Sequence, residues 1–127
     1  MLFYRRGKVL TRTLIYKDRK GRQPVLDFIQ ELAASSGKDA RINLKKVGSY
    51  ITLLDKDGLS IGEPYIKHLK GDIWELRPLR NRILFAALVE GKFVLLHVFL
   101  KRTQKTPVSE IEKAERELED FRRRFEP

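Results

Sequence analysis

Cysteine is absent from the 127 residues of this chain, and histidine occurs only at positions 68 and 97. Without cysteine the chain has neither a disulfide framework nor a thiolate metal site, and two histidines argue against zinc. No apolar run approaches the roughly 18 residues that cross a bilayer. The first six residues also lack the apolar middle region of a signal peptide. We therefore expect a cytoplasmic protein with no cofactor, no metal and no membrane partner.

Acidic residues are too few to balance the basic ones: 17 Asp and Glu stand against 27 Lys and Arg, a net charge of +10. Such an excess favours a nucleic acid, an acidic protein or an anionic surface as partner. The excess lies in two segments, since residues 1–22 carry eight cations and one acid and residues 64–107 carry nine and three. The two remaining segments are close to neutral, so the basic character is local.

The length suggests a single domain over residues 1–127. β-forming residues predict a strand at 12–17, and apolar residues at helical spacing predict a helix from Pro24 and a second from about Asp39, its N-cap, to Asp57. Four short strands follow, separated by short turns, at 65–70, 73–78, 83–89 and 93–101. Thr106 and Pro107 predict the N-cap and first residue of a last helix. The order predicts an α+β fold with helices on one face of a mostly antiparallel sheet.

Strand alternation assigns side chains to the two faces of this sheet. Val94, Leu96, Val98 and Leu100 form a purely apolar row, which we expect to face the helices. The opposite, open face would then display a polar set, with Arg102 and Lys105 at its rim: Glu75, Arg77, Arg82, His97, Phe99 and Lys101. A row of charges on an open face is most often only solvated, and a histidine between Leu95 and Phe99 is most often a packing residue.

The combination of cations, an imidazole and an aromatic ring on one face is also suited to RNA. Cations bind phosphates and an aromatic ring stacks on an unpaired base. Cleavage of RNA by its own 2′-OH needs charge stabilisation on the phosphorane and proton transfer at both ends. Arginine supplies the first, and lysine or histidine the second. Glu75 is an alternative base, or a residue that orients Arg77.

Residues 72–121 resemble the phage-derived, HigB-like branch of the RelE/ParE toxin superfamily. The resemblance rests on Trp-Glu-Leu-Arg at 74–77, an arginine at the start of the next strand, Leu-His-x-Phe-x-Lys-Arg-Thr-Gln-Lys-Thr-Pro at 96–107, and a Glu-x-x-x-Ala helix. The segments GRQPVLDFIQEL and YIKHLKGDIWEL extend it to about residues 12–122. Residues 1–10 fall outside it and are unassigned. Arg102 stands where the family commonly has a second lysine, so a base at that position is not expected here.

The resemblance implies a RelE-like fold and the toxin of a type II toxin–antitoxin system. Such toxins typically cut mRNA on the ribosome without a metal and are silenced by an antitoxin, here commonly a helix-turn-helix DNA-binding protein. The catalytic candidates are Arg77, Arg82, His97 and Lys101, and the RNA-binding candidates are Phe99, Arg102, Thr103, Gln104, Lys105, Lys67 and Lys70. Two other functions stay open: a ParE-like inhibitor of DNA gyrase, and a non-catalytic nucleic-acid-binding regulatory module.

Overall fold

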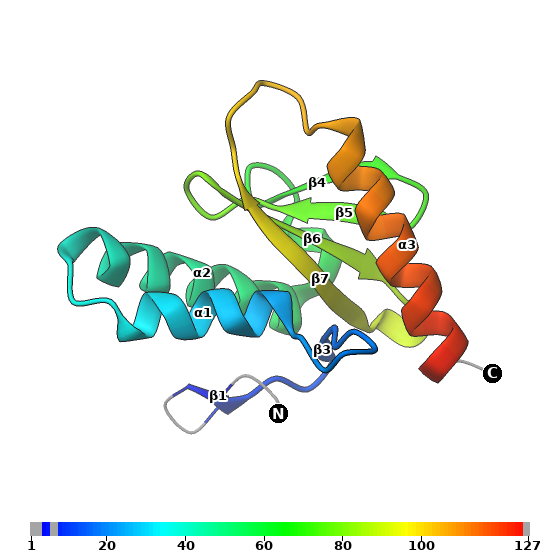
Figure 1. Ribbon diagram of the computed structural model, residues 1–127, viewed down its shortest axis with the longest axis horizontal. Helices are drawn as coiled ribbons and strands as arrows, with labels where there is room; N and C mark the ends of the chain where they lie inside the picture. Colours follow the sequence, from blue (N-terminus) through cyan, green and yellow to red (C-terminus); the bar gives the residue numbers. More distant parts are fainter. Residues whose placement is uncertain (1–3, 6–7, 126–127) are drawn as a thin grey trace.

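The computed structural model describes residues 4–5 and 8–125 (Figure 1). It contains three α-helices, α1 (Pro24–Ala34), α2 (Lys38–Asp57) and α3 (Val108–Phe125), and short 3-10 turns at Gly58–Ile61 and Val89–Gly91. The strands are β1 (Tyr4–Arg5), β2 (Lys8–Val9), β3 (Thr13–Ile15), β4 (Ile66–Lys70), β5 (Ile73–Leu76), β6 (Asn81–Ala87) and β7 (Phe93–Leu100). β1 and β2 form an antiparallel pair within the unassigned segment 1–10, and Leu10 is buried in the core. Residues 1–3 and 6–7 of this segment lie outside the described residues.

The main sheet has five strands in the order β3-β7-β6-β5-β4. β4 to β7 pair antiparallel with their neighbours in sequence, which confirms the predicted meander. β3 lies at the edge, parallel to β7. The sheet is therefore mixed and mostly antiparallel, and the α+β class is confirmed.

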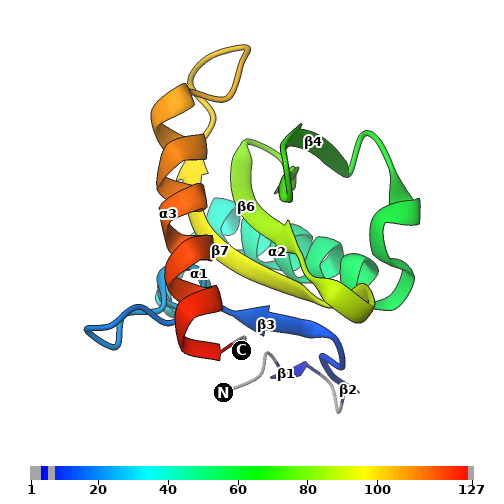
Figure 2. The same ribbon diagram turned by 90° about the vertical axis from the view of Figure 1, so that its right-hand side faces the viewer.

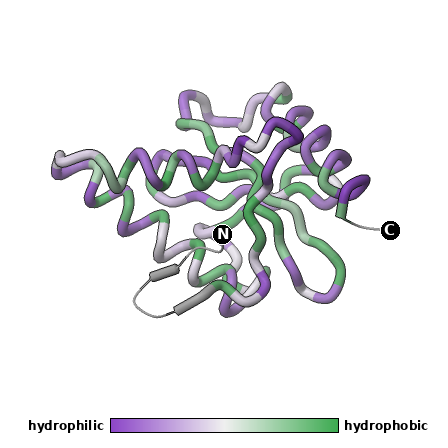
Figure 3. The backbone as a smooth tube through the Cα atoms, turned by 60° about the horizontal axis from the view of Figure 1, so that its bottom comes forward, coloured by the Kyte–Doolittle hydropathy of each residue, from purple (hydrophilic) through white to green (hydrophobic). Residues whose placement is uncertain are grey.

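The helices cover both faces of this sheet, so the prediction that they share one face is wrong. Figures 1 and 2 show α1 and α2 side by side on one side and α3 on the other. Ile83 and Phe85 of β6 pack in the core under α1 and α2, whereas Leu84 and Ala86 pack in the core under α3. A strand buried on both faces is apolar along its whole length, and in Figure 3 the tube is green through the centre of the molecule.

A β-bulge interrupts the alternation of β7. Leu84 pairs with His97 and Phe85 pairs with Leu95, so Leu96 has no partner on β6. As a result Leu96 and His97 both lie on the α3 side of the sheet, and Val98 lies on the α1 and α2 side. The predicted rows of β7 are therefore wrong: Val94 and Leu96 share a face with His97 and Phe99. An extra residue in one strand is the usual cause of such a change of face.

The ends of the helices differ from expectation by about one residue. α1 begins at Pro24, as predicted, and α2 ends before Gly58, whose φ of 67° suits glycine. α2 begins at Lys38 after an N-cap at Gly37, not at Asp39. α3 begins at Val108, one residue after Pro107.

Asp55 at the end of α2 positions the start of β3. Its carboxylate accepts hydrogen bonds from the backbone N–H groups of Thr11 (3.0 Å) and Arg12 (2.9 Å). Burial alone would raise the pKa of Asp55, but these donors hold it below its ordinary value. Arg12 in turn donates to the Asp55 carbonyl at 2.7 Å, which ties the segment before β3 to the carboxyl end of α2.

None of the helices in the described part of the chain is long and apolar enough to span a bilayer.

Candidate functional site

A cavity of about 390 Å³ lies where β5, β6, the end of β7 and the start of α3 meet. The loop from Lys101 to Pro107 connects β7 to α3 (Figure 1) and lines this cavity. Five cations and two acids line the cavity, with a phenylalanine and small polar residues between them: Arg77, Arg82, Lys101, Arg102, Lys105, Glu75, Glu110, Phe99, Leu100, Thr103, Gln104, Thr106 and Pro107. The structure thus brings eight of the eleven predicted site residues to one place. We call this cavity the cleft.

Glu75 is the buried centre of the cleft, with only 2 % of its surface exposed. Its Oε1 lies 3.4 Å from Arg77 Nε and 3.7 Å from Arg82 Nε. Its Oε2 accepts a hydrogen bond from the hydroxyl of Thr106, which was predicted to cap α3. One carboxylate therefore faces two guanidinium groups and leaves a net positive charge at the base of the cleft.

Arg82 is held rigidly by the turn that precedes β6. The guanidinium donates to the carbonyls of Leu79 and Asn81, both at 2.9 Å. Leu79 has a φ of 60°, a conformation that is uncommon for a residue other than glycine. Burial lowers the pKa of Arg82, opposed by the charge of Glu75 and assisted by that of Arg77. The positive charge of Arg82 is thus fixed in position and incompletely compensated.

Arg77 is half-buried, and its Nε makes no hydrogen bond within the described part of the chain. The 3.4 Å approach to Glu75 is an ion pair without hydrogen-bond geometry. A buried donor without a partner carries a desolvation cost. A ligand oxygen in the cleft would remove that cost.

The loop cations Lys101, Arg102 and Lys105 make no ion pair with an acid among residues 4–5 and 8–125. β7 ends at Leu100, so strand alternation does not extend into the loop, and Lys101 and Arg102 line the same cleft. A backbone hydrogen bond of 2.8 Å from Lys101 to Arg80 holds the start of the loop. The loop presents its positive charges to the cleft and to solvent.

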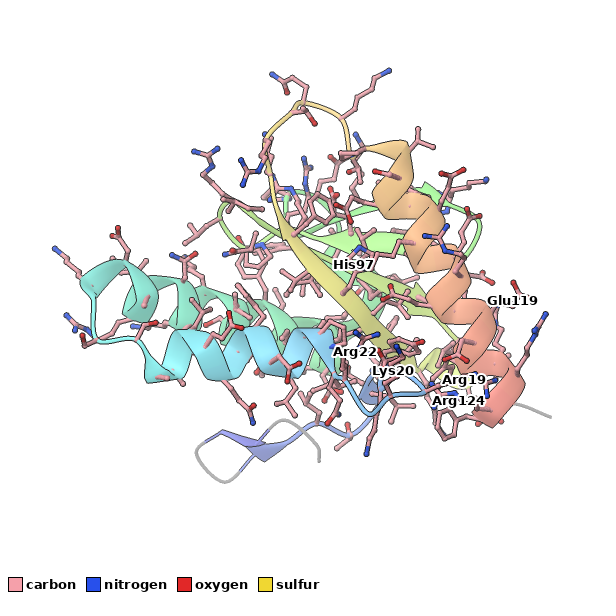
Figure 4. The ribbon with its side chains drawn as sticks, in the orientation of Figure 1. Arg19, Lys20, Arg22, His97, Glu119 and Arg124 are labelled. Atoms are coloured by element: carbon pink, nitrogen blue, oxygen red, sulfur yellow. The ribbon has the colours of Figure 1, made fainter. Side chains whose placement is uncertain are left out.

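His97 lies behind the cleft, not in it. Its side chain is buried between β7 and α3 (Figure 4), with 1 % of its surface exposed. Nδ1 lies 2.5 Å from Glu117 Oε1, and Nε2 lies 2.9 Å from Glu110 Oε1. The expectation of an open face around His97 is wrong, because α3 covers this part of the sheet.

Glu110 lines the cleft and was missed by the sequence analysis. A signal was present: Glu110 and Glu117 are seven residues apart, on the same side of the helix as the buried residues Ala114, Leu118 and Phe121. Carboxylates on the buried side of a helix need buried partners. The only histidine in the β7 sequence is such a partner.

Lys67 and Lys70 are not brought to the cleft. Lys67 is exposed on β4, directly opposite Glu75 in the pairing with β5. Lys70 is exposed as well, and its ammonium group lies 3.4 Å from Glu115 of α3. Their predicted contact with RNA stays a prediction that the geometry of the cleft does not support.

A second cationic region lies at the carboxyl end of α3, and Figure 4 shows Arg19 and Arg124 there. Asp120 accepts hydrogen bonds from Tyr16 (2.6 Å), Arg19 (2.7 Å) and Arg124 (2.6 Å). Led by the Tyr16 hydrogen bond, these donors lower the pKa of Asp120 to about 2. Burial and the Asp120 carboxylate raise the pKa of Tyr16 to about 12. We call this group the Asp120 network.

Metal ligands are not concentrated anywhere in the described residues: no three His, Cys, Asp or Glu side chains gather in a group that could hold an ion. The cleft holds two carboxylates, Glu75 and Glu110, and the first already faces two arginines.

Comparison with protein families shows what the chain is similar to. The family model described as "Phage derived protein Gp49-like (DUF891)" matches residues 27–119. The matched segment contains all the residues that line the cleft. No curated protein matches the chain.

Proposed function

The chain belongs to the phage-derived Gp49-like family of toxin-like proteins, and we propose that it is the toxin of a type II toxin–antitoxin pair that cuts mRNA. Within this proposal the chain is a RelE-like, HigB-related endoribonuclease that works on the ribosome without a metal ion. Its partners are the ribosome with its mRNA and a helix-turn-helix antitoxin, all in the cytoplasm.

The observation that carries the proposal is the uneven charge of the cleft. Five cations and two carboxylates line it, and three of the cations have no acidic partner within the described chain. RNA phosphates are the abundant cellular anions that fit a row of cations beside an aromatic ring. Phe99 lines the same cleft and offers a face for a base.

The cleft also supports cleavage, not only binding. Arg77 and Arg82 both approach Oε1 of Glu75, so the two guanidinium groups lie close enough to contact the same phosphate. When a 2′-OH attacks the adjacent phosphorus, negative charge grows on the non-bridging oxygens, and fixed cations stabilise that charge. Lys101, in the wall of the cleft, carries a proton that a leaving 5′-oxygen can accept.

A gyrase inhibitor needs no such arrangement, because it binds a protein and breaks no phosphodiester bond. Fixed, undercompensated arginines in a concave site are therefore the feature that favours the nuclease over the gyrase inhibitor. A regulatory module would bind RNA with the same cations and leave it intact.

The test maps mRNA ends shortly after expression is induced, with Arg77→Ala as the matched control. We expect new ends within translated reading frames, with a 5′-OH and a 2′,3′-cyclic phosphate, and none in the control. Purified toxin should keep cutting ribosome-bound mRNA when trace divalent ions other than the ribosome's magnesium are removed. Growth arrest with intact mRNA and double-strand breaks at gyrase sites would instead establish the gyrase inhibitor.

A further inference from the structure

The two carboxylates of the cleft differ in how they are engaged. Glu75 faces Arg77, Arg82 and the Thr106 hydroxyl, so both of its oxygens have partners. The carboxylate of Glu110 contacts His97 through Oε1 and makes no other ion pair or hydrogen bond within the described residues. Its side chain is 29 % exposed and lines the cleft. Glu110 therefore has an oxygen available to a ligand.

Glu110 is also held in a fixed orientation. His97 is buried, and the second nitrogen of its ring is engaged by Glu117 at 2.5 Å. The chain Glu117–His97–Glu110 thus runs from the interior of the α3 interface to the cleft wall. An arrangement in which one group orients the base that acts on the substrate is typical of acid–base sites.

Anchoring of α3 does not account for both carboxylates. Glu117 contacts His97 more closely, is 12 % exposed, and does not line the cleft. Glu117 alone therefore provides a buried link between α3 and β7. A carboxylate near a helix N-terminus is favourable by itself, but that effect does not require Glu110 to contact a buried imidazole.

We propose that Glu110 is a catalytic residue, the general base that accepts the proton of the attacking 2′-OH; this rests on the proposed ribonuclease function. The 2′-oxygen forms a bond to the adjacent phosphorus while its proton moves to a carboxylate oxygen of Glu110. The bond from phosphorus to the 5′-oxygen breaks, and that oxygen takes a proton from a cation of the cleft. The products are a 2′,3′-cyclic phosphate and a 5′-OH, without an oxidant or co-reactant.

The proposal reassigns a role that the sequence suggested for His97. A buried imidazole with carboxylates on both nitrogens cannot reach a substrate. It can hold the carboxylate that does, so the proton-transfer position moves from β7 to the first turn of α3.

The experiment compares Glu110→Gln with Glu117→Gln in single-turnover cleavage of mRNA on saturating ribosomes. Each variant removes one carboxylate from His97, but only the first removes one from the cleft. We expect Glu110→Gln to lower the rate by about 10²-fold or more at unchanged ribosome affinity, the usual scale for a general base. Glu117→Gln should lower the rate by no more than about 10-fold. Thermal unfolding of both variants separates these losses from loss of fold.

The pH dependence gives a second, independent measurement. The native rate should fall as the pH is lowered, because a protonated carboxylate cannot accept the 2′-OH proton. That acidic limb should disappear in Glu110→Gln and persist in Glu117→Gln. The other titratable groups around Glu110 are the same in both variants: His97 on β7, Glu75 on β5, Arg82 on β6, and Lys101 and Lys105 in the loop.

Each result has one interpretation. Equal losses in the two variants, or an acidic limb that survives Glu110→Gln, would overturn the assignment and leave both glutamates as anchors of α3. If the native protein itself yields no cyclic phosphate ends, the proposed nuclease function fails, which is a separate outcome. Cleavage by the native protein together with normal rates in Glu110→Gln refutes only the role of Glu110.

Discussion

The two ends of α3 both lie in basic surroundings, yet they use their charge differently. At the carboxyl end, Arg19 and Arg124 share Asp120, Arg123 pairs with Glu119, and Arg122 pairs with Asp72. At the amino end, two arginines share Glu75, and the three loop cations have no acidic partner in the described chain. The number of cations is similar at the two ends, so the pairing distinguishes them.

This difference has an energetic meaning. Ion pairs at the surface contribute about 0–1 kcal/mol each, and their cations are already neutralised. Unpaired cations that converge on a concave surface repel one another, and the field is focused where the walls exclude water. An incoming polyanion relieves that repulsion only at the cleft. The pairing of the cations, more than their number, therefore supports the cleft as the proposed binding site.

The largest expected effect is a loss of folding stability when the shared acid at the amino end of α3, Glu75, is removed, compared with removal of Asp120 at the carboxyl end. Glu75→Ala removes a carboxylate that is 2 % exposed and leaves Arg82, which is 8 % exposed, beside Arg77 with no shared acid, and we expect a loss of about 3–5 kcal/mol of unfolding free energy. Asp120→Ala removes a carboxylate that is 18 % exposed and whose partner Arg19 is 65 % exposed, so the loss should be about 1 kcal/mol. Urea unfolding of both variants measures the contrast. Equal losses would show that the two ends do not differ in burial of charge.

The next effect concerns catalysis and should be confined to the cleft. Arg77→Ala should lower the cleavage rate by about 10²–10³-fold, since it removes a fixed charge beside the phosphate. Glu75 keeps Arg82 as partner, so the melting temperature should change by only a few degrees. Arg19→Ala, at the other end of α3, should cut at the native rate. A comparable loss in Arg19→Ala would mean that the Asp120 network also takes part.

Within the cleft, replacing Lys101 should change the cleavage rate, whereas replacing Arg102 or Lys105 should change the binding of RNA. Lys101→Ala should lower the single-turnover rate by about 10²-fold at saturating ribosome, if it donates the proton to the leaving oxygen. Arg102→Ala and Lys105→Ala should mainly weaken binding and reduce its dependence on salt, as lost phosphate contacts do. Rates at increasing ribosome concentration and two salt concentrations separate these effects. Full recovery of Lys101→Ala at high ribosome concentration would make Lys101 a binding residue.

The smallest effect belongs to the Asp120 network and depends on pH. Folding lowers the pKa of Asp120 to about 2, so its ionised carboxylate stabilises the folded state above about pH 4. This stabilisation is lost as the pH falls toward 2. Folding raises the pKa of Tyr16 to about 12, so its protonated hydroxyl stabilises the folded state below about pH 10. This stabilisation is lost as the pH rises toward 12.

Tyr16→Phe should therefore lower stability by about 1 kcal/mol near neutral pH and flatten both limbs of the stability curve. Ultraviolet titration should show a late tyrosine ionisation near pH 12 in the native chain and none in the variant. Cleavage at neutral pH should be unchanged. A late ionisation that persists in Tyr16→Phe would place the perturbed tyrosine elsewhere.

The sequence predicted the elements well because their signals are local. Pro24 and the apolar spacing that follows it define α1, and Gly58 ends α2. The turns between β4 and β7 are short enough to fix the antiparallel meander. The motif at 96–107 placed the cleft at the end of β7, because the residues of a loop stay near the strand that they follow.

The errors arose where tertiary contacts decide. No local sequence pattern predicts that α3 packs on the face opposite α1 and α2, although the continuous apolar run of β6 is consistent with it. The bulge at Leu96 depends on the pairing of β7 with β6, and the residues of β7 carry no sequence signal that predicts it. The contact of His97 with Glu110 joins residues from two elements, so strand periodicity could place neither in its true surroundings.

The bulge at Leu96 has a further consequence for how this chain tolerates change. It shifts the parity of β7, so the residues after it point to faces opposite to those that unbroken alternation would give them. Without the bulge, unbroken alternation from Val94 through Leu96 would turn His97 toward α1 and α2, with every side chain of the cleft chemically intact. Leu96 is the extra residue, so its deletion would leave His97 opposite Leu84 and on the α3 side. The face on which His97 and Phe99 lie therefore depends on one extra residue of backbone in β7, and not only on which side chains the strand carries.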